Sequence, residues 1–367
     1  FILTMLVSGL STLSNSMLSP ALPIYSKALG YGTDIAGTIV AVATFLSMFG
    51  RLLSGGWSDR VNRKTLLLTA LGMITAAFVL FCFAHTLPLL FAAKILQGIG
   101  SGVISTVLCT VAFDTLPPEL LGSGIGVFSL ASSLAQCVAP SIGTALAHAG
   151  MYRTLFLSAA LVAALSFLVL MLIPVPLTPR AIQWAEAKNN GTLKKRGFHI
   201  SDYLCREAMP AAMLLLMNGI IHAAIMNYLS ICGLSRGINS IATFFVINSV
   251  VLIASRPLLG KFADHKPLSW LLLPGYALMA ASCVLIATAQ SMPPVLIAAV
   301  CYGLGFGATQ CAGQLAAIRS VGLDRRNVAN STYYVGGDVG LTLGAYIDGA
   351  LAASVGYAVM YNFIAAC

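Results

Sequence analysis

Long apolar runs, separated by short polar breaks, fill nearly the whole chain. Most of these runs hold about 20 residues or more, enough for a helix to cross the hydrocarbon core of a bilayer. The pattern therefore predicts an all-α, multi-pass membrane protein. The predicted spans are residues 1–29, 33–56, 65–84, 87–113, 121–148 and 153–175 in the first half, and 208–232, 239–263, 268–289, 293–318, 327–352 and 356 onward in the second.

Composition agrees with this pattern. Hydrophobic residues make up 58% of the 367 residues and charged residues only 8%, whereas about a quarter of a typical soluble domain is charged. So few charges could not cover the surface of a soluble protein of this size, which excludes a soluble α/β fold. The chain starts and stops inside apolar runs, so we expect the first and last helices to be incomplete in a protein of about twelve helices.

One long polar stretch, at residues 177–207, divides the chain. We interpret it as a linker between an N-terminal six-helix bundle at 1–176 and a C-terminal bundle at 208–367. Its residues around Trp184 could instead form a short amphipathic helix at the membrane surface.

An internal repeat connects the two halves. The segment 97–102, Gln-Gly-Ile-Gly-Ser-Gly, recurs as Tyr-Gly-Leu-Gly-Phe-Gly at 302–307, which is 205 positions later. At the same offset, Gly55 and Asp59 recur as Gly260 and Asp264. Two unrelated patterns with one offset indicate a duplicated module. In a membrane protein this predicts two bundles related by a pseudo-two-fold axis along the membrane normal, and transport by alternating access.

The basic residues predict the orientation. All lysines and arginines except Lys27, Lys94, Arg153 and Arg236 lie in the linker or at the helix ends on the linker's side. The positive-inside rule then puts the linker and both termini in the cytoplasm, in a protein of the cell membrane. The net charge of +9 reflects this topology, so no nucleic-acid partner is expected. The nine cysteines are scattered without ligand spacing, so we expect no metal, disulfide or other cofactor.

The loop after the second span carries a family resemblance. Residues 55–64 read Gly-x-Trp-Ser-Asp-Arg-x-Asn-Arg-Lys. This resembles the Gly-x-Leu-Ala-Asp-Arg-x-Gly-Arg-Lys signature of the major facilitator superfamily, with Trp57 and Asn62 as departures. The resemblance implies a conformational latch that stabilises the outward-facing state, strongest in the first half. The implied latch residues are Gly55, Asp59, Arg60, Arg63 and Lys64, with Gly260 and Asp264 from the second copy.

Two further spans resemble the same family. Lys94-x-x-Gln97-Gly98 is similar to the family's Arg-x-x-Gln-Gly motif, with lysine in place of arginine. An ammonium at this depth is costly, so it faces a cavity or a partner, where it could assist proton coupling, or it reaches the nearer interface. The fifth span resembles the motif of antiporting exporters, through Gly126, Ala139, Pro140 and Gly143.

Asp338 is our leading candidate for the proton site. It lies about halfway along the predicted span 327–352, where a carboxyl group would tend to be neutral unless paired. The alternative is a structural acid tied to a tyrosine or lysine. Asp348 lies nearer the external end of the span, and we expect it to be wetted.

The resemblance also implies a central cavity lined by the first, fourth, seventh and tenth spans. His222 in this set could titrate near neutrality and assist coupling, or serve only as a hydrogen-bonding group. The candidates are uncharged, which favours a neutral, amphipathic or cationic substrate over a multiply charged anion. The implied cavity residues are Asn15, Gln97, His222, Asn227, Tyr302 and Gln310.

These observations together predict a proton-coupled secondary exporter of a small molecule, expected to act as a monomer. The alternatives are an importer or facilitator of a sugar or other nutrient, and a non-transporting sensor on the same scaffold. We do not expect an enzyme, because no nucleophile and base stand at a recognisable spacing. ATP-driven transport is disfavoured because the sequence lacks a Gly-x4-Gly-Lys-Ser/Thr loop.

Overall fold

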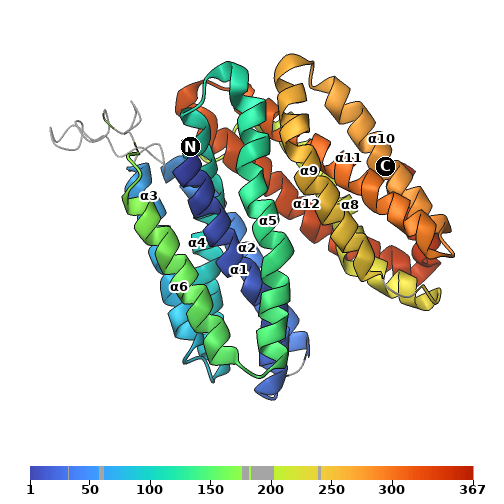
Figure 1. Ribbon diagram of the computed structural model, residues 1–367, viewed down its shortest axis with the longest axis horizontal. Helices are drawn as coiled ribbons and strands as arrows, with labels where there is room; N and C mark the ends of the chain where they lie inside the picture. Colours follow the sequence, from blue (N-terminus) through green and yellow to red (C-terminus); the bar gives the residue numbers. More distant parts are fainter. Residues whose placement is uncertain (32, 58–61, 176–181, 183–201, 239–240, 367) are drawn as a thin grey trace. The chain divides into compact units, whose positions relative to one another are not determined.

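A computed structural model of the protein describes residues 1–31, 33–57, 62–175, 182, 202–238 and 241–366 (Figure 1). Helices make up nearly all of these residues, and none of them forms a β-strand. The helices are α1 (Ile2–Ala28), α2 (Thr33–Trp57), α3 (Arg63–Phe81), α4 (Leu87–Asp114), α5 (Leu121–His148), α6 (Tyr152–Met171), α8 (Met209–Ser235), α9 (Ala242–His265), α10 (Ser269–Thr288), α11 (Met292–Arg319), α12 (Arg326–Val355) and α13 (Tyr357–Ala366), with short 3₁₀ turns η1 (Pro118–Leu120), η3 (Arg206–Ala208) and η4 (Leu323–Arg325).

The helix lengths confirm a multi-pass membrane protein. In the described part of the chain, nine helices are long and apolar enough to cross a membrane: α1, α3 to α6, and α8 to α11. Helices α2 and α12, of 25 and 30 residues, also have spanning length. The predicted spans agree closely with the helices. For example, the span predicted at 87–113 is the helix Leu87–Asp114.

The chain divides into two compact units. The first unit comprises residues 1–116, 128–206 and 321–332, and the second comprises 117–127, 207–320 and 333–367. Each unit therefore contains a short segment from the other half of the sequence. The beginning of α12 belongs to the first unit, and the beginning of α5 belongs to the second.

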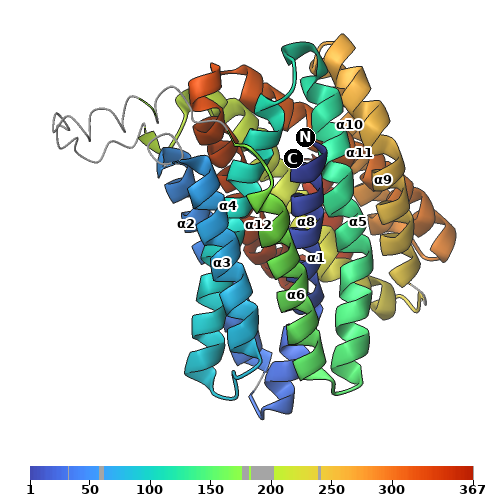
Figure 2. The same cartoon turned by 60° about the vertical axis from the view of Figure 1, so that its left-hand side comes forward.

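In the first unit, α4 packs against α2 and α3, while α6 packs against α1 and α3 (Figures 1 and 2). Aromatic side chains fill the space between α1, α3 and α6. The ring of Phe156 lies 5.1 Å from that of Tyr25 and 5.5 Å from that of Phe81, measured between centroids. All three side chains are buried. This cluster holds three helix ends together at one end of the unit.

In the second unit, α11 packs against α8, α9 and α10, and α13 packs against α10 and α8. Buried Tyr302, Met279 and Phe244 belong to the apolar core between these helices. The hydroxyl of Tyr361 on α13 donates a hydrogen bond to the Ala224 carbonyl of α8 at 3.0 Å. The short α13 is thereby fixed to the rest of the unit.

Glycines let the helices approach closely, and their contacts repeat as the sequence does. The glycines of α4 meet α2 and α3, and those of α11 meet α9 and α10. The partner residues are themselves separated by 205 positions. Gly98 contacts Ala43 as Gly303 contacts Asn248. Gly100 contacts Ala70 as Gly305 contacts Gly275, and Gly102 contacts Ser47 as Gly307 contacts Leu252. The sequence duplication is therefore also a duplication of packing.

The contact at Gly102 gives a test of this packing. A Cβ added there would overlap the backbone oxygen of Ser47, whereas a Cβ at Gly72 would meet no atom within 4 Å. We therefore expect Gly102→Leu to force α2 and α4 apart and to destabilise the protein by about 1–3 kcal/mol. Gly72→Leu should melt like the wild type. Melting temperatures in detergent measure both, and equal values for the two variants would contradict this account.

Candidate functional site: polar networks at the helix ends

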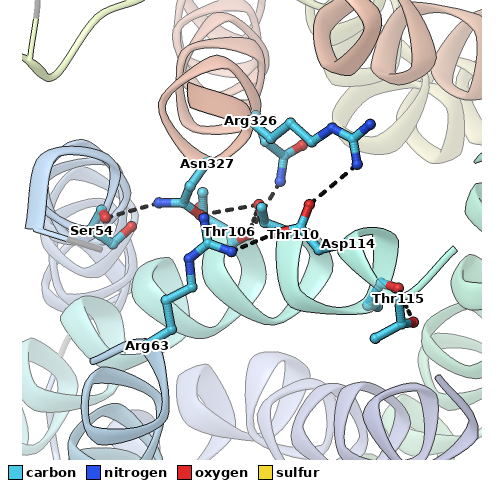
Figure 3. A network of polar contacts seen from close by, with 10 residues as sticks. Ser54, Arg63, Thr106, Thr110, Asp114, Thr115, Arg326 and Asn327 are labelled. Carbon is cyan, nitrogen blue, oxygen red and sulfur yellow. Dashed lines mark hydrogen bonds and ion pairs between the residues drawn. The ribbon is translucent and has the colours of Figure 1, made fainter. Parts of the chain in front are cut away.

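A carboxylate between two guanidinium groups lies at the end of α4 (Figure 3). The Asp114 carboxylate accepts a hydrogen bond from Arg63 Nη1 at 2.6 Å through one oxygen. Its other oxygen accepts from Arg326 Nη1 at 3.2 Å. Arg63 is only 5% exposed, so this group of charges is largely shielded from solvent, which strengthens each attraction.

Local structure positions the three side chains. Asn62 caps α3, because its Oδ1 accepts from the backbone N–H of Lys64 at 2.9 Å. Helix α3 therefore begins at Arg63, while α4 ends at Asp114 and α12 begins at Arg326. Three helix ends thus converge on one carboxylate. The dipole of α4 disfavours a negative charge at the C-terminal end of that helix. The two arginines compensate for this.

The next turns of α12 continue the network with neutral groups. Asn327 donates from Nδ2 to the Ser54 carbonyl at 2.9 Å, and its Oδ1 accepts from the Thr110 hydroxyl at 3.1 Å (Figure 3). Asn330 donates to the Thr106 carbonyl at 3.2 Å. All of these side chains are buried, so buried polar contacts hold the beginning of α12 on α2 and α4.

Ser331 and Gly55 complete this contact. The Ser331 hydroxyl donates to the Arg51 carbonyl at 2.7 Å. A Cβ added to Gly55 would lie 3.1 Å from the Ser331 side chain. A residue larger than glycine at position 55 would therefore require the Ser331 side chain to move by a few tenths of an ångström.

A second network lies at the end of α9. The Asp264 carboxylate accepts from the backbone N–H groups of Gly122 at 2.6 Å and Ser123 at 2.7 Å, and from the Ser123 hydroxyl at 2.6 Å. Asp264 thereby caps the N-terminus of α5, where a negative charge is stabilised by the helix dipole. Arg319 lies 3.7 Å from the same carboxylate. Gly260 packs directly on the backbone of Gly122.

The two networks occupy equivalent places in the repeat but use different chemistry. Gly126 in α5 corresponds to Ser331 in α12 by the 205-residue offset. Gly126 packs on the Arg256 carbonyl, and Ser331 donates to the equivalent Arg51 carbonyl. The acid Asp114, however, corresponds to the base Arg319. The backbone approach has been kept in both copies while the ionic partners have changed.

The residues that the sequence assigned to the latch are partly brought together here. Arg63, Gly55, Gly260 and Asp264 belong to the two networks. Lys64 lies apart, with its ammonium donating to the Met171 carbonyl at 2.8 Å on an exposed surface. Asp59 and Arg60 lie outside the described residues.

Asp114, Arg326 and Asn327 were missed by the sequence reasoning. The available signal was an acid closing one span at 114 and a base opening another at 326. Pairing them requires knowing that α12, far away in the sequence, begins beside the end of α4.

A separate polar chain lies within the first unit. Lys94 Nζ donates to Gln97 Oε1 at 2.7 Å, and Gln97 Nε2 donates to Asn15 Oδ1 at 2.8 Å. Asn15 in turn donates to the Ser11 carbonyl at 2.8 Å. Lys94 is only 9% exposed, so its ammonium is held by a partner inside the bundle rather than reaching solvent.

In the second unit, His222 contacts an aromatic stack. Its Nδ1 makes a 2.5 Å hydrogen bond with the Tyr302 hydroxyl, and its ring stacks on Phe306 with centroids 5.1 Å apart. Gln310 accepts from Arg256 Nη2 at 2.7 Å, and Asn227 is exposed. Of the expected cavity residues in this unit, His222 and Tyr302 are thus bonded to each other, Gln310 is bonded to an arginine, and Asn227 is exposed.

Helix α12 carries both of the acids singled out in the sequence. Asp338 is buried, with 8% of its surface exposed. Gly336 and Gly340 beside it pack directly on the backbone of α8, at Ala212 and Leu216. This close approach accounts for the burial of a carboxyl group in the middle of the helix.

Asp348 is fully buried, so the expectation that it would be wetted was wrong. In the described part of the chain, neither carboxylate oxygen has a hydrogen-bond partner. The Tyr228 side chain of α8 covers this part of α12. Its hydroxyl donates to the Ala345 carbonyl at 2.9 Å and also lies against Gly349. Distance from the end of a predicted span does not reveal such cover.

The residues of the antiporter-type motif are packing residues of α5. Ala139 is fully buried, and Pro140 lies inside the helix. Gly143 packs directly on the Met17 carbonyl of α1. Within each unit, this helix therefore makes backbone contacts through small residues, in the way that favours close packing in membranes.

The Major Facilitator Superfamily model matches residues 4–345. Among curated relatives, the bacillibactin exporter of Bacillus subtilis (strain 168) is 29% identical over 143 residues, covering 37% of this chain and 36% of the exporter. The vesicular acetylcholine transporter of Homo sapiens is 32% identical over 169 residues, covering 46% of this chain and 31% of that transporter. Myo-inositol transporter 3C of Cryptococcus neoformans is 28% identical over 121 residues, covering 30% and 20%. The matched region is well under half the length of each relative.

Solved structures share the fold over nearly their whole length. The superfamily transporter FucP, in the outward conformation, gives a TM-score of 0.81 at 16% identity, covering 100% of this chain and 95% of FucP. The human organic anion transporter MFSD10 gives a TM-score of 0.78 at 15% identity, covering 100% of this chain and 96% of MFSD10. Because the family model matches most of the sequence and the fold agrees with it, the chain belongs to the major facilitator superfamily.

Proposed function

We propose that the chain is a proton-coupled secondary exporter that moves a small neutral, amphipathic or cationic molecule by alternating access. In this proposal, residues 1–176 and 208–367 are the two moving bundles and 177–207 joins them. The linker and both termini lie in the cytoplasm of a cell-membrane protein that acts as a monomer. The observation that carries the proposal is the pair of polar networks that joins helix ends from the two halves of the sequence.

These networks suit a latch because they can be broken at modest cost. Arg63 Nε and Nη2, and Arg326 Nε, are buried without hydrogen-bond partners in the described part of the chain. Burying such groups without partners costs free energy. This cost offsets part of their attraction to Asp114. Opening the network would return them to water. The closed arrangement is thus held by a balance that a ligand or a proton can shift.

Helix α12 can transmit such a shift. Its first turns, Arg326 to Ser331, make the contacts of the network, and Asp338 lies about two turns further along the same helix. We expect proton binding at Asp338 to favour one arrangement of α12 and substrate binding to favour the other. Lys94 and His222 are the further candidates for coupling, because each is an ionisable side chain within a span and is hydrogen-bonded to a neutral partner.

Two observations support export. The α5 residues Gly126, Ala139, Pro140 and Gly143 fit the antiporter-type motif and form tight helix contacts. A curated relative is an exporter, of bacillibactin. The substrate is expected to contact Asn15, Gln97, His222, Asn227, Tyr302 and Gln310.

Import is the second candidate, because a myo-inositol transporter is also among the relatives. The direction of movement separates the two functions. In vesicles with an imposed proton gradient, an exporter of the antiporting kind moves substrate against the direction of proton flow, whereas a symporter moves it with the protons.

Asp338→Asn tests the proton site. The amide keeps the size of the carboxyl group but cannot exchange a proton, so pH-gradient-driven efflux should be abolished while the protein still folds. Counterflow without a gradient should persist. The control is Asp324→Asn, in the partly exposed turn η4, which should transport like the wild type. Gradient-driven transport at the wild-type rate in the Asp338 variant would remove this residue from the mechanism.

Asp114→Asn tests the latch. The change removes the charge that two arginines share, so the closed arrangement should lose about 1–2 kcal/mol, given the partial exposure of the site. Cys205 is a native reporter, because it is fully buried and its backbone N–H donates to Thr332 of α12 at 2.9 Å. Its alkylation rate, followed by peptide mass spectrometry, should rise about tenfold. Glu119→Gln, in the turn η1, is the matched control. An unchanged rate in the Asp114 variant would show that the carboxylate does not hold α12 closed.

A further inference from the structure

Two hollows lie next to each other on the first unit, one at the end of the helices opposite Arg63 and one along α3 and α6. The first is a cavity of about 550 Å³ between the last turns of α1 and α3 and the first turn of α6. Its lining includes Tyr25, Cys82, His85, Tyr152 and Arg153. The Tyr25 ring lies 4.9 Å from that of Tyr152 and its hydroxyl donates to the Ala84 carbonyl, so one wall of the cavity is rigid.

The second hollow is an apolar groove of about 590 Å³ between α3 and α6, which lie side by side in Figure 2. Small residues open it, among them Gly72, Ala76 and Ala164. Leu168, which also lines it, is 58% exposed. This face of the unit is therefore of the kind that contacts hydrocarbon chains.

The cavity and the groove adjoin, because Phe83 lines both. A molecule that occupied both would have a polar end at the helix ends and an apolar end along the spans. This is the shape of a membrane lipid rather than that of a soluble ion. Tyrosines at a helix end also match the depth at which lipid headgroups lie.

The charges of the cavity select the headgroup. Arg153 and His85 line it, and no described acidic side chain does. Neither side chain has a hydrogen-bond or ion-pair partner among the described residues, and both are exposed. A phosphate group would satisfy a guanidinium through paired hydrogen bonds.

We propose that this is a binding site for one anionic phospholipid. The phosphate group lies near Arg153 and His85, and one acyl chain lies in the groove between α3 and α6. The lipid joins the ends of α1, α3 and α6, so it stabilises the first unit when bound. The proposal needs only that the chain spans a bilayer and is independent of the transported substrate.

Cys82 makes the site testable without an introduced label, because it lines the cavity and is partly exposed. The purified full chain in detergent would be mixed with phosphatidylglycerol, with phosphatidylcholine of the same acyl chains, or with glycerol phosphate. Alkylation of Cys82 would be followed by peptide mass spectrometry, alongside the melting temperature. Phosphatidylglycerol should slow alkylation at least fivefold and raise the melting temperature. Phosphatidylcholine should act weakly, and glycerol phosphate should have no effect.

Variants separate the two parts of the site. Arg153→Gln combined with His85→Gln should remove the preference for phosphatidylglycerol over phosphatidylcholine. A Cβ at Gly72 meets no atom within 4 Å, so Gly72→Leu should fill the groove and abolish protection by both lipids. The controls are Lys261→Gln, an exposed base in the second unit, and Gly72→Ala. Both should keep the wild-type response.

Three outcomes would overturn the proposal. Equal protection by the two lipids would show that charge does not select the headgroup. Protection that survives the double Arg153 and His85 variant would show that the cavity is not the headgroup site. Protection by glycerol phosphate alone would identify a site for a soluble phosphate, because the acyl chain would then contribute nothing.

Discussion

The close approach of helix backbones at glycine is the constraint on which the rest of this structure depends. Helices in a bilayer gain little from burying apolar surface against each other, because lipid tails are equally apolar. Association instead relies on dense contact, which small residues permit. The central helices α4 and α11 meet their neighbours through Gly98 and Gly102 in one unit and through Gly305 in the other. Helix α4 packs against α1, α2 and α3, and α11 packs against α8, α9 and α10.

The same principle explains why each unit contains a helix start from the other half. The first turns of α12 reach α2 at Gly55, and those of α5 reach α9 at Gly260. Once the backbones are this close, buried polar groups have to be paired. Asn327 and Asp264 do so by bonding to backbone groups. Contacts of this kind have definite partners and no large apolar area, which makes them suitable for repeated breaking and remaking.

The helices could be predicted from the sequence because an apolar run of spanning length permits only one structure in a bilayer. The duplication could also be predicted, and the contacts of Gly98 and Gly303 repeat with it. The polar partners could not. Asp114 and Arg326 are 212 residues apart, and nothing local specifies their pairing. Asp348 was misjudged for a related reason, since its cover by Tyr228 comes from a distant helix.

Three ionisable residues inside the spans break the repeat, whereas Arg51 and Arg256 keep it. Each of the three has an uncharged counterpart 205 positions away. The pairs are Lys94 with Ala299, Asp338 with Ser133, and Asp348 with Gly143. A charge within a bilayer is costly, so a scaffold alone would not retain it. Lys94 therefore belongs to the first unit, and both acids belong to the second. In the proposed mechanism, a proton taken up by either acid would change the charge of the second unit only, so two halves with similar packing would respond differently to the same gradient.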